Sequence, residues 1–426
     1  MSLPQSAKLE TLLLHAGYEP DPTTGSRTVP IYQTSAYSFR DAEHASNLFS
    51  LKESGNIYTR IMNPTNDAFE KRMAALEGGI GALAFASGHA AIVGIILNIA
   101  KVGDDIVSSP KLYGGTYNMF SHSLPNMGIT VNFAKDNSPE SYAKAITPNT
   151  KAIFAETISN PEIGVTDIEG LAEVAHKNGI PLIIDATFTP YINRSIEFGA
   201  DIVIHSATKF ICGHGSSMGG VVVDSGKFNY DNGKFPLLSE PDPSYHGLAF
   251  TSLGGAAFIT RLRTQILRDL GACLAPFNSF LFLQGLETLH LRMERHSQNA
   301  LVVAEYLEAH ENVSWVNYPA LPGHKDHAIC QKYFPKGAGA ILTFGIKGGL
   351  VAGRKFIDSL ELFSHVANVG DTKSLVIHPA STTHSQLTPE QMKSTGTTVD
   401  MIRLSVGIEN VSDIINDLEQ ALNSTK

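Results

Sequence analysis

Two residues of opposite charge follow neighbouring apolar stretches of the sequence. Asp185 ends the stretch PLIID, and Lys209 ends IVIHSATK, which contains the next predicted strand. Because the carboxyl ends of parallel strands face the ligand crevice of an open sheet, both side chains can meet one small molecule there. This pair suits pyridoxal 5'-phosphate (PLP), since the amine can form a Schiff base and the acid can keep the pyridine nitrogen protonated. Taken alone, the pair could also be a structural ion pair or two solvated strand ends.

A phosphate site would complete such a cofactor site. Ser87 and Gly88 follow the stretch ALAFA and open an apolar helical segment, and backbone N–H groups at a helix N-terminus bind anions. Ser206 and Thr208 are alternate residues just before the lysine, so their hydroxyl groups can lie on the same side of the chain. A plain turn at 87–88 and a capping role for Ser206 are the alternatives, but the coincidence with the carboxylate and the amine favours a site.

Tyr113 and Arg403 could contact a bound ring and a substrate. Tyr113 precedes two glycines soon after a predicted strand, so its ring could stack on a pyridine while the backbone comes close. Arg403 lies in MIRLSV, where it faces away from the alternating apolar residues of a strand. An arginine fixed on a strand can hold a carboxylate with two parallel hydrogen bonds. A buried core tyrosine and a surface arginine are the alternative interpretations.

The elements that must position these residues begin near Gly81. From there, short apolar stretches alternate with helical segments, which is typical of βαβ units and a mostly parallel sheet. Apolar residues at helical spacing predict a helix from Asp167 to Asn178, with Gly179 at its end. The predicted strands are Ala82–Ala86, Asp105–Ser108, Ile129–Phe133, Ala152–Ala155, Pro181–Ile184, Ile202–His205 and Gly220–Val223.

The two ends of the chain follow other patterns. Residues up to about Arg60 have no sustained period, which predicts an extended arm with one short helix that lies on something else. A loop-like stretch from Ser225 to Gly255 ends the alternation, and a long helical pattern runs from Asn278 to Ala309. A smaller α+β domain follows. Its predicted strands and closing helix are Val313–Val316, Ile341–Ile346, Leu375–Ile377, Met401–Val406 and Ser412–Leu422.

Composition limits the classes of protein and partner. The chain has 426 residues, of which 43% are hydrophobic and 17% charged, and a formal net charge of -9 without long blocks of like sign. These values predict a soluble globular protein that binds neither nucleic acid nor a membrane surface. Cys212, Cys273 and Cys330 lie far apart, and the histidines lack metal-ligand spacing, so neither disulfides nor a metal is expected. The N-terminus does not read as a signal peptide, and the expected location is cytoplasmic.

The motifs together resemble a known family. SATK with its lysine, the upstream Asp185, the Ser87-Gly88 turn, YTRIMNPT and RLSVG are similar to motifs of the Cys/Met-metabolism family of fold-type I PLP enzymes. The resemblance covers nearly the whole chain. It implies the α/β fold of PLP-dependent transferases, with an N-terminal arm over residues 1–62, a large PLP-binding domain over 63–260 and a C-terminal domain over 261–426.

The same resemblance implies a role for each residue of these motifs. Lys209 would be the Schiff-base lysine and proton shuttle, Asp185 would pair with the pyridinium, and Asn160 of ETISNP would approach the ring 3-hydroxyl. Arg403 would bind the substrate carboxylate. The cofactor phosphate would be held by Ser87, Gly88, His89, Ser206 and Thr208 of one subunit and by Tyr58 and Arg60 of its neighbour. His89 stands where the family often has methionine. Its backbone N–H could still contact the phosphate, and no role is assigned to its side chain.

Three finer features resemble the O-acetylhomoserine sulfhydrylases of the family. Thr157–Ser159 replace a Ser-Pro that the lyases usually have, the segment after Gly226 is long, and Asn368 stands where many lyases have a serine near the substrate. The resemblance implies γ-replacement: O-acetyl-L-homoserine and sulfide give L-homocysteine and acetate, for methionine and cysteine biosynthesis. Tyr113 and Tyr58 would assist departure of acetate. The expected assembly is a homotetramer, a dimer of dimers that share active sites.

Other functions stay open on the residues alone. Methionine γ-lyase, cystathionine γ-lyase and cystathionine γ-synthase share the cofactor residues and differ in the reaction partner. A noncatalytic α/β protein that binds an anion through Lys209 is an alternative of a different class. A nucleotide enzyme is disfavoured, because the sequence contains no GxxxxGK[ST] and no GxGxxG after its first strand.

Overall fold

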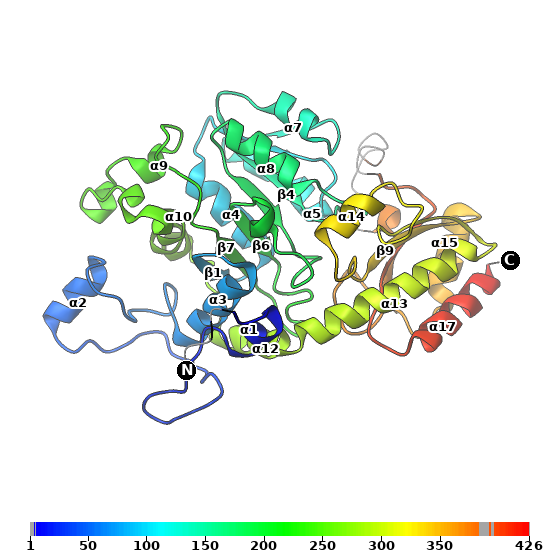
Figure 1. Cartoon of the computed structure of the whole chain (residues 1–426), viewed down its shortest axis with the longest axis horizontal. Coiled ribbons are helices and arrows are strands. Elements are labelled where there is room, and N and C mark those ends of the chain that lie inside the picture. The colour runs from blue at the N-terminus through cyan, green and yellow to red at the C-terminus, as the bar shows by residue number, and fades with distance from the viewer. Residues whose placement is uncertain (1–3, 5, 383–391, 393–395, 426) are drawn as a thin grey trace.

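The computed structural model describes residue 4 and residues 6–382, 392 and 396–425, which form two β-sheets connected by long helices (Figure 1). The larger sheet has the strand order β1-β7-β6-β5-β4-β2-β3. Its neighbouring strands are parallel except at β7, which runs antiparallel to β1 and β6. The strands are β1 (Gly81–Phe85), β2 (Asp105–Ser108), β3 (Thr130–Phe133), β4 (Thr150–Glu156), β5 (Leu182–Asp185), β6 (Ile202–His205) and β7 (Gly220–Asp224).

Each strand predicted for this sheet is present, with ends within two residues of the expected ones. The strands are almost continuously apolar because helices bury both faces of the sheet. The predicted helix after residue 167 is α8, which Asp167 caps by accepting a hydrogen bond from the backbone of Gly170. The main helices of this part are α3 (Pro64–Glu77), α4 (Gly88–Ile99), α5 (Gly114–Asn118), α7 (Pro139–Ala145), α8 (Ile168–Lys177), α9 (Pro236–Ser239) and α10 (Ala257–Arg261).

The smaller sheet has the order β10-β11-β12-β9-β8, and all of its predicted strands are present. Its elements are β8 (Val313–Asn317), α14 (His327–Tyr333), β9 (Ile341–Ile346), α15 (Gly349–Ser359), β10 (Ser364–His365), β11 (Leu375–Ile377), β12 (Met401–Ser405) and α17 (Val411–Ser424). Arg403 pairs with Thr343 on one side and with Ile377 on the other, so this sheet fixes its position. The domain division at residues 62 and 260 stays a prediction.

The long helical pattern near residues 278–309 corresponds to two helices, α12 (Pro276–Glu287) and α13 (Leu289–Ala309). The prediction of one long helical segment is therefore wrong at Thr288, where the helix is interrupted. Thr288 separates them with φ -112° and ψ 6°. Its hydroxyl lies 3.5 Å from the carbonyl of Gly285, and such local side-chain bonds compete with the helical backbone pattern. After this break, α13 runs beside the smaller sheet and contacts β8 and β9 (Figure 1).

The arm before residue 62 contains two short helices, where one was predicted: α1 (Leu9–His15) and α2 (Ala42–Phe49). α1 packs against α3 and α12 of its own chain. By contrast, α2 projects away from both sheets (Figure 1). Its first turn is capped by Asp41, whose side chain accepts from the backbone of His44. The expectation that the arm lies on something else therefore concerns the segment around α2.

A buried pair joins α3 to the larger sheet. His205 Nε2 lies 2.8 Å from Glu77 Oε1, and both side chains are fully buried. Removing one partner leaves the other buried without its hydrogen bond, so we expect Glu77→Ala to lower the free energy of unfolding by about 3 kcal/mol. Urea denaturation measures this loss, with Glu173→Ala on the exposed face of α8 as the control. A loss below about 1 kcal/mol would show that the pair is dispensable.

Candidate active site

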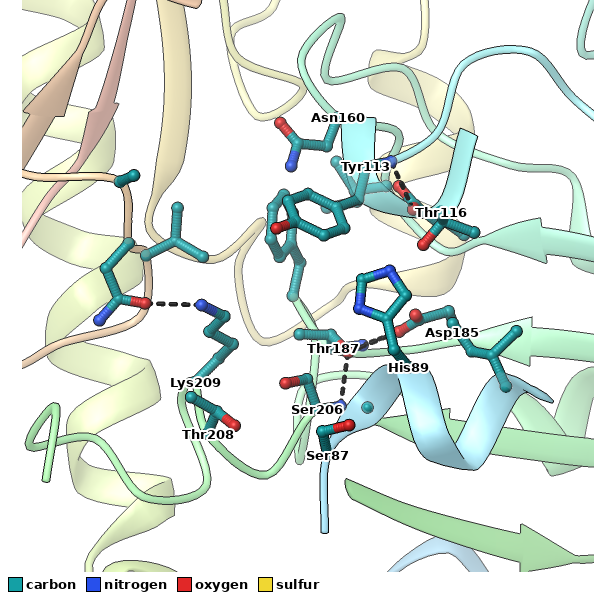
Figure 2. A pocket seen from close by; sticks show the side chains of 18 of the residues that line it. Ser87, His89, Tyr113, Thr116, Asn160, Asp185, Thr187, Ser206, Thr208 and Lys209 are labelled. Carbon is teal, nitrogen blue, oxygen red and sulfur yellow. Dashed lines mark hydrogen bonds between the residues drawn. The ribbon is translucent and has the colours of Figure 1, made fainter. Parts of the chain in front are cut away.

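The carboxyl ends of β4, β5 and β6 open into a cavity of about 230 Å³ (Figure 2). Asp185 is paired with Glu156 of β4 and with Ile204 of β6, so the three strand ends lie side by side. Most of the predicted site residues line this one cavity. They are Ser87, Gly88, His89, Tyr113, Asn160, Asp185, Ser206, Thr208, Lys209, Asn368 and Arg403.

One side of the cavity is built to receive an anion. Ser87 caps α4 by accepting from the backbone of Ala90 at 3.1 Å, and the first N–H groups of the helix have no partner within it. A Cβ added to Gly88 would lie only 2.9 Å from Cβ of Ser206, so only glycine allows this approach. Ser87, Ser206 and Thr208 lie together on that side (Figure 2). A phosphate group fits this cradle.

Asp185 lies on another wall of the cavity. Its Oδ1 accepts hydrogen bonds from the backbone N–H of Thr187 at 3.0 Å and from the hydroxyl of Thr187 at 2.5 Å. Burial raises the pKa of Asp185, and the two hydrogen bonds from Thr187 oppose that shift. A protonated ring nitrogen beside the carboxyl group would favour its ionised form.

Lys209 projects toward the cavity from the opposite side (Figure 2). Its Nζ donates to Oδ1 of Asn368 at 2.6 Å. Burial, followed by the positive charge of Arg403, lowers the pKa of Lys209 to about 8. Near pH 7 on the order of a tenth of the amine is therefore neutral, far more than for an ordinary lysine, and the neutral amine is the nucleophile.

We therefore expect PLP to attach covalently to the cofactor-free protein with a pH midpoint near 8. Attachment needs the neutral amine, so its rate should rise as pH increases through that value, well below the ordinary lysine pKa of 10.5. Stopped-flow absorbance after mixing with PLP measures the rate, and Lys209→Ala gives the background from other lysines. A midpoint near 10.5 would contradict the effect of burial.

Arg403 enters the cavity from the smaller sheet. Its side chain is buried, and Nη1 donates to Oδ1 of Asn160 at 3.0 Å. Burial lowers the pKa of Arg403 to about 10, so the guanidinium still carries its charge at neutral pH. A carboxylate is the natural ligand for such a buried cation. Elements of both sheets thus contribute to the wall of one site.

Tyr113 and His89 present aromatic rings to the cavity. Their ring centroids are 5.7 Å apart with an interplanar angle of 51°, and Figure 2 shows both rings facing the space near Asp185. Tyr113 is 45% exposed, so its face is free to stack on a bound ring. The imidazole of His89 also lines the site, in addition to the backbone contact expected at that position.

Tyr58 and Arg60 do not line the cavity of their own chain. The guanidinium of Arg60 lies 5.5 Å from the centroid of the Tyr58 ring and donates to the carbonyl of Arg268. Tyr58 is 42% exposed. Contact of this pair with the site of a neighbouring subunit stays a prediction.

The cavity also contains residues that the sequence analysis missed. Glu156 and Thr187 lie beside Asp185, and the other newly found wall residues include Thr116, Phe188 and Met218. Glu156 ends β4 just as Asp185 ends β5, so the same strand-end argument could have found it. No group of three His, Cys, Asp or Glu side chains within the described residues could hold a metal ion. In the same part of the chain, no helix is long and apolar enough to cross a membrane.

A family model described as Cys/Met metabolism PLP-dependent enzyme matches residues 10–423. The chain belongs to this family. The match confirms the predicted family, its PLP cofactor and its fold. The cavity agrees with that cofactor, because a phosphate cradle, a lysine amine, a carboxyl group and an exposed aromatic ring surround one space.

Individual relatives of this PLP enzyme cover almost its whole length. An O-acetyl-L-homoserine sulfhydrylase of Leptospira meyeri is 54% identical over 99% of this chain and 98% of its own. A homocysteine synthase of Schizosaccharomyces pombe is 53% identical over 98% and 99%. A crystal structure of a putative O-acetylhomoserine (thiol)-lyase from Campylobacter jejuni, with a pyridoxyl-lysine phosphate, has a TM-score of 0.95 at 43% identity and covers 98% of this chain and 100% of its own.

Proposed function

We propose that this enzyme replaces the acetate of O-acetyl-L-homoserine with sulfide, giving L-homocysteine and acetate. The relatives named for this substrate or product support the proposal. The observation that carries it is the charge of the cavity wall, where Arg403 is the one arginine among the described lining residues. That arginine suits the α-carboxylate, and this chain lines the cavity with no second arginine for an acyl group with its own carboxylate, while Arg60 of the neighbouring subunit is expected at the phosphate. An uncharged acetyl ester fits better than a succinyl ester.

The roles of the site residues follow from their positions. Lys209 would hold PLP covalently, Asp185 would hold the ring nitrogen protonated, and Tyr113 would stack on the ring. Asn160 accepts from Arg403 through its oxygen, which leaves its amide NH₂ to donate to the ring 3-oxygen. The phosphate would be held by Ser87, Gly88, His89, Ser206 and Thr208.

PLP, when bound, supplies a ring that withdraws electrons from the carbons of an attached amino acid. Arg403 would bind the α-carboxylate and so orient the substrate. Lys209 would then move protons one at a time: its amine takes the proton from the α-carbon and passes it to the carbon that joins the substrate nitrogen to the cofactor, which leaves the amine free to take a proton from the β-carbon. Acetate then leaves the γ-carbon, HS⁻ bonds there, and the proton steps run in reverse. Tyr113 would assist departure of acetate. Asn368, 2.6 Å from Lys209 Nζ, would steady that amine between transfers.

A substrate panel tests the proposal. O-acetyl- and O-succinyl-L-homoserine are each supplied with sulfide, while L-methionine and L-cystathionine are supplied alone. Turnover with the acetyl ester and little with the other three supports the assignment. Rapid release of 2-ketobutyrate from methionine or cystathionine would assign the enzyme to the γ-lyases, and a preference for the succinyl ester would overturn the argument from charge.

We also infer that two subunits share each active site and that two such dimers form a tetramer. The segment around α2 projects from the chain (Figure 1). Tyr58 and Arg60 follow this segment and do not line the cavity of their own chain. Exposed apolar side chains of that segment, among them Phe39 and Phe49, suit burial against another copy. The proposed division is an arm over residues 1–62, a PLP domain over 63–260 and a C-terminal domain over 261–426. The cytoplasmic location stays a prediction.

Complementation measures this sharing. Tyr58→Phe and Lys209→Ala protomers should each be inactive, because each loses one residue of every site. In mixed dimers, one of the two sites has both residues intact, so up to about half of the dimer's activity should return. Failure to regain activity, despite subunit exchange shown by mass spectrometry, would contradict the shared site.

A further inference from the structure

Glu156 is a carboxyl group of the cavity that the proposed reaction does not use. It ends β4, and the strand register pairs it with Asp185 at the end of β5. Paired residues of neighbouring parallel strands point to the same face, and the strands lie about 4.8 Å apart. Glu156 is only 8% exposed. Two carboxyl groups therefore stand next to each other in a site with little access to water.

The hydrogen bonds of Glu156 lead to two other site residues. Its Oε1 accepts from the backbone N–H of Tyr113 at 2.8 Å, and the backbone N–H of Asn160 also donates to this carboxyl group. Tyr113 presents the stacking ring, and Asn160 accepts from Arg403. Glu156 thus holds two separate backbone segments of the cavity wall.

No lysine, arginine or histidine within the described residues forms an ion pair with Glu156. Asp185 likewise accepts two hydrogen bonds, a backbone N–H and a hydroxyl from Thr187. It differs in its charged neighbours, because His205 and His89 lower its pKa and in the proposed function it also faces the protonated ring nitrogen. Two adjacent carboxylates in a buried site rarely ionise together, and the one with the weaker compensation keeps its proton. Burial and the neighbouring Asp185 both raise the pKa of Glu156 well above its ordinary value.

We propose that Glu156 is a positioning residue that stays protonated and fixes the backbone of Tyr113 and Asn160, leaving Asp185 as the anion of this wall. A neutral Glu156 does not compete with Asp185 for the positive ring nitrogen. Its oxygen still accepts from the two N–H groups. The inference rests on the proposed PLP site, but it does not depend on which sulfur compound is the second substrate.

Two substitutions separate charge from hydrogen bonding. Glu156→Gln keeps a carbonyl oxygen and is neutral, so the PLP dissociation constant should stay within about threefold and the visible circular dichroism of the bound cofactor should be kept. Glu156→Ala removes the acceptor, so PLP affinity should fall about tenfold and the circular dichroism should weaken as Tyr113 loses its position. Infrared difference spectra of ¹³C-glutamate-labelled wild-type holoenzyme against Glu156→Gln should show the C=O band of a neutral carboxyl group in the wild type.

The opposite results would overturn the proposal. A Glu156→Gln variant that loses as much affinity as Glu156→Ala, or a wild type without the neutral carboxyl band, would show that Glu156 is an anion. If Glu156→Ala does not fold, the glutamine variant and the infrared band still decide. Asp185→Asn is the matched control: it should change PLP affinity and the cofactor spectrum. If Asp185→Asn changes neither, the proposed orientation of PLP fails, whatever Glu156 does.

Discussion

Lys209→Ala should lower kcat/KM by about 10⁴-fold or more, since the substitution removes both the covalent attachment point and the proton shuttle. Lys209 is the one lysine among the described residues that line the cavity. PLP should still bind through the phosphate cradle, but without a covalent link. Sodium borohydride reduction followed by peptide mapping of the wild type should mark Lys209, and the variant should yield no marked peptide.

Lys177→Ala, at the exposed end of α8, is the control for this experiment and should retain activity within about twofold. A marked peptide containing another lysine of the wild type would disprove the assignment. Turnover by Lys209→Ala within tenfold of the wild type would also disprove its role in proton transfer.

Arg403→Leu should lower kcat/KM about 10²- to 10³-fold, because the substrate carboxylate would face an apolar wall without its cation. PLP should still bind, since the phosphate cradle and Lys209 lie on the other sheet. Arg403→Lys should recover only part of the loss, because an ammonium group cannot make two parallel hydrogen bonds. Steady-state kinetics and PLP titration separate the two effects. A loss confined to PLP affinity would remove Arg403 from substrate binding.

Much of the site could be predicted from the sequence because its residues follow apolar strands. Asp185 and Lys209 come directly after or close to such strands, and the parallel order of the sheet brings strand ends together. The Ser87-Gly88 turn was informative for a similar reason. It lies between a strand and a helix, so the N-terminus of that helix faces the same edge of the sheet as the strand ends. Glu156 obeyed the same rule, and it begins the ETISNP motif, but only Asn160 of that motif was given a role.

Other features depend on information that one sequence pattern does not contain. α3 was not predicted, although Asn63 caps it and Gly78 ends it in a left-handed conformation, because its apolar residues face helices as well as the sheet. At Thr288 the backbone leaves the helical conformation although the helical pattern of the sequence continues on both sides. Tyr58 and Arg60 do not line the cavity of their own chain. Their predicted contact with a cofactor depends on a second subunit, which the sequence of one chain does not describe.

The partition of products tests the central claim most directly. The enzyme is supplied with O-acetyl-L-homoserine, with and without sulfide, and acetate, homocysteine and 2-ketobutyrate are measured over the same interval. Replacement at the γ-carbon predicts that acetate release depends on sulfide and equals homocysteine formation, with little 2-ketobutyrate. Acetate release at the same rate without sulfide, matched by 2-ketobutyrate, would contradict the account, because the enzyme would then eliminate acetate without forming the carbon–sulfur bond.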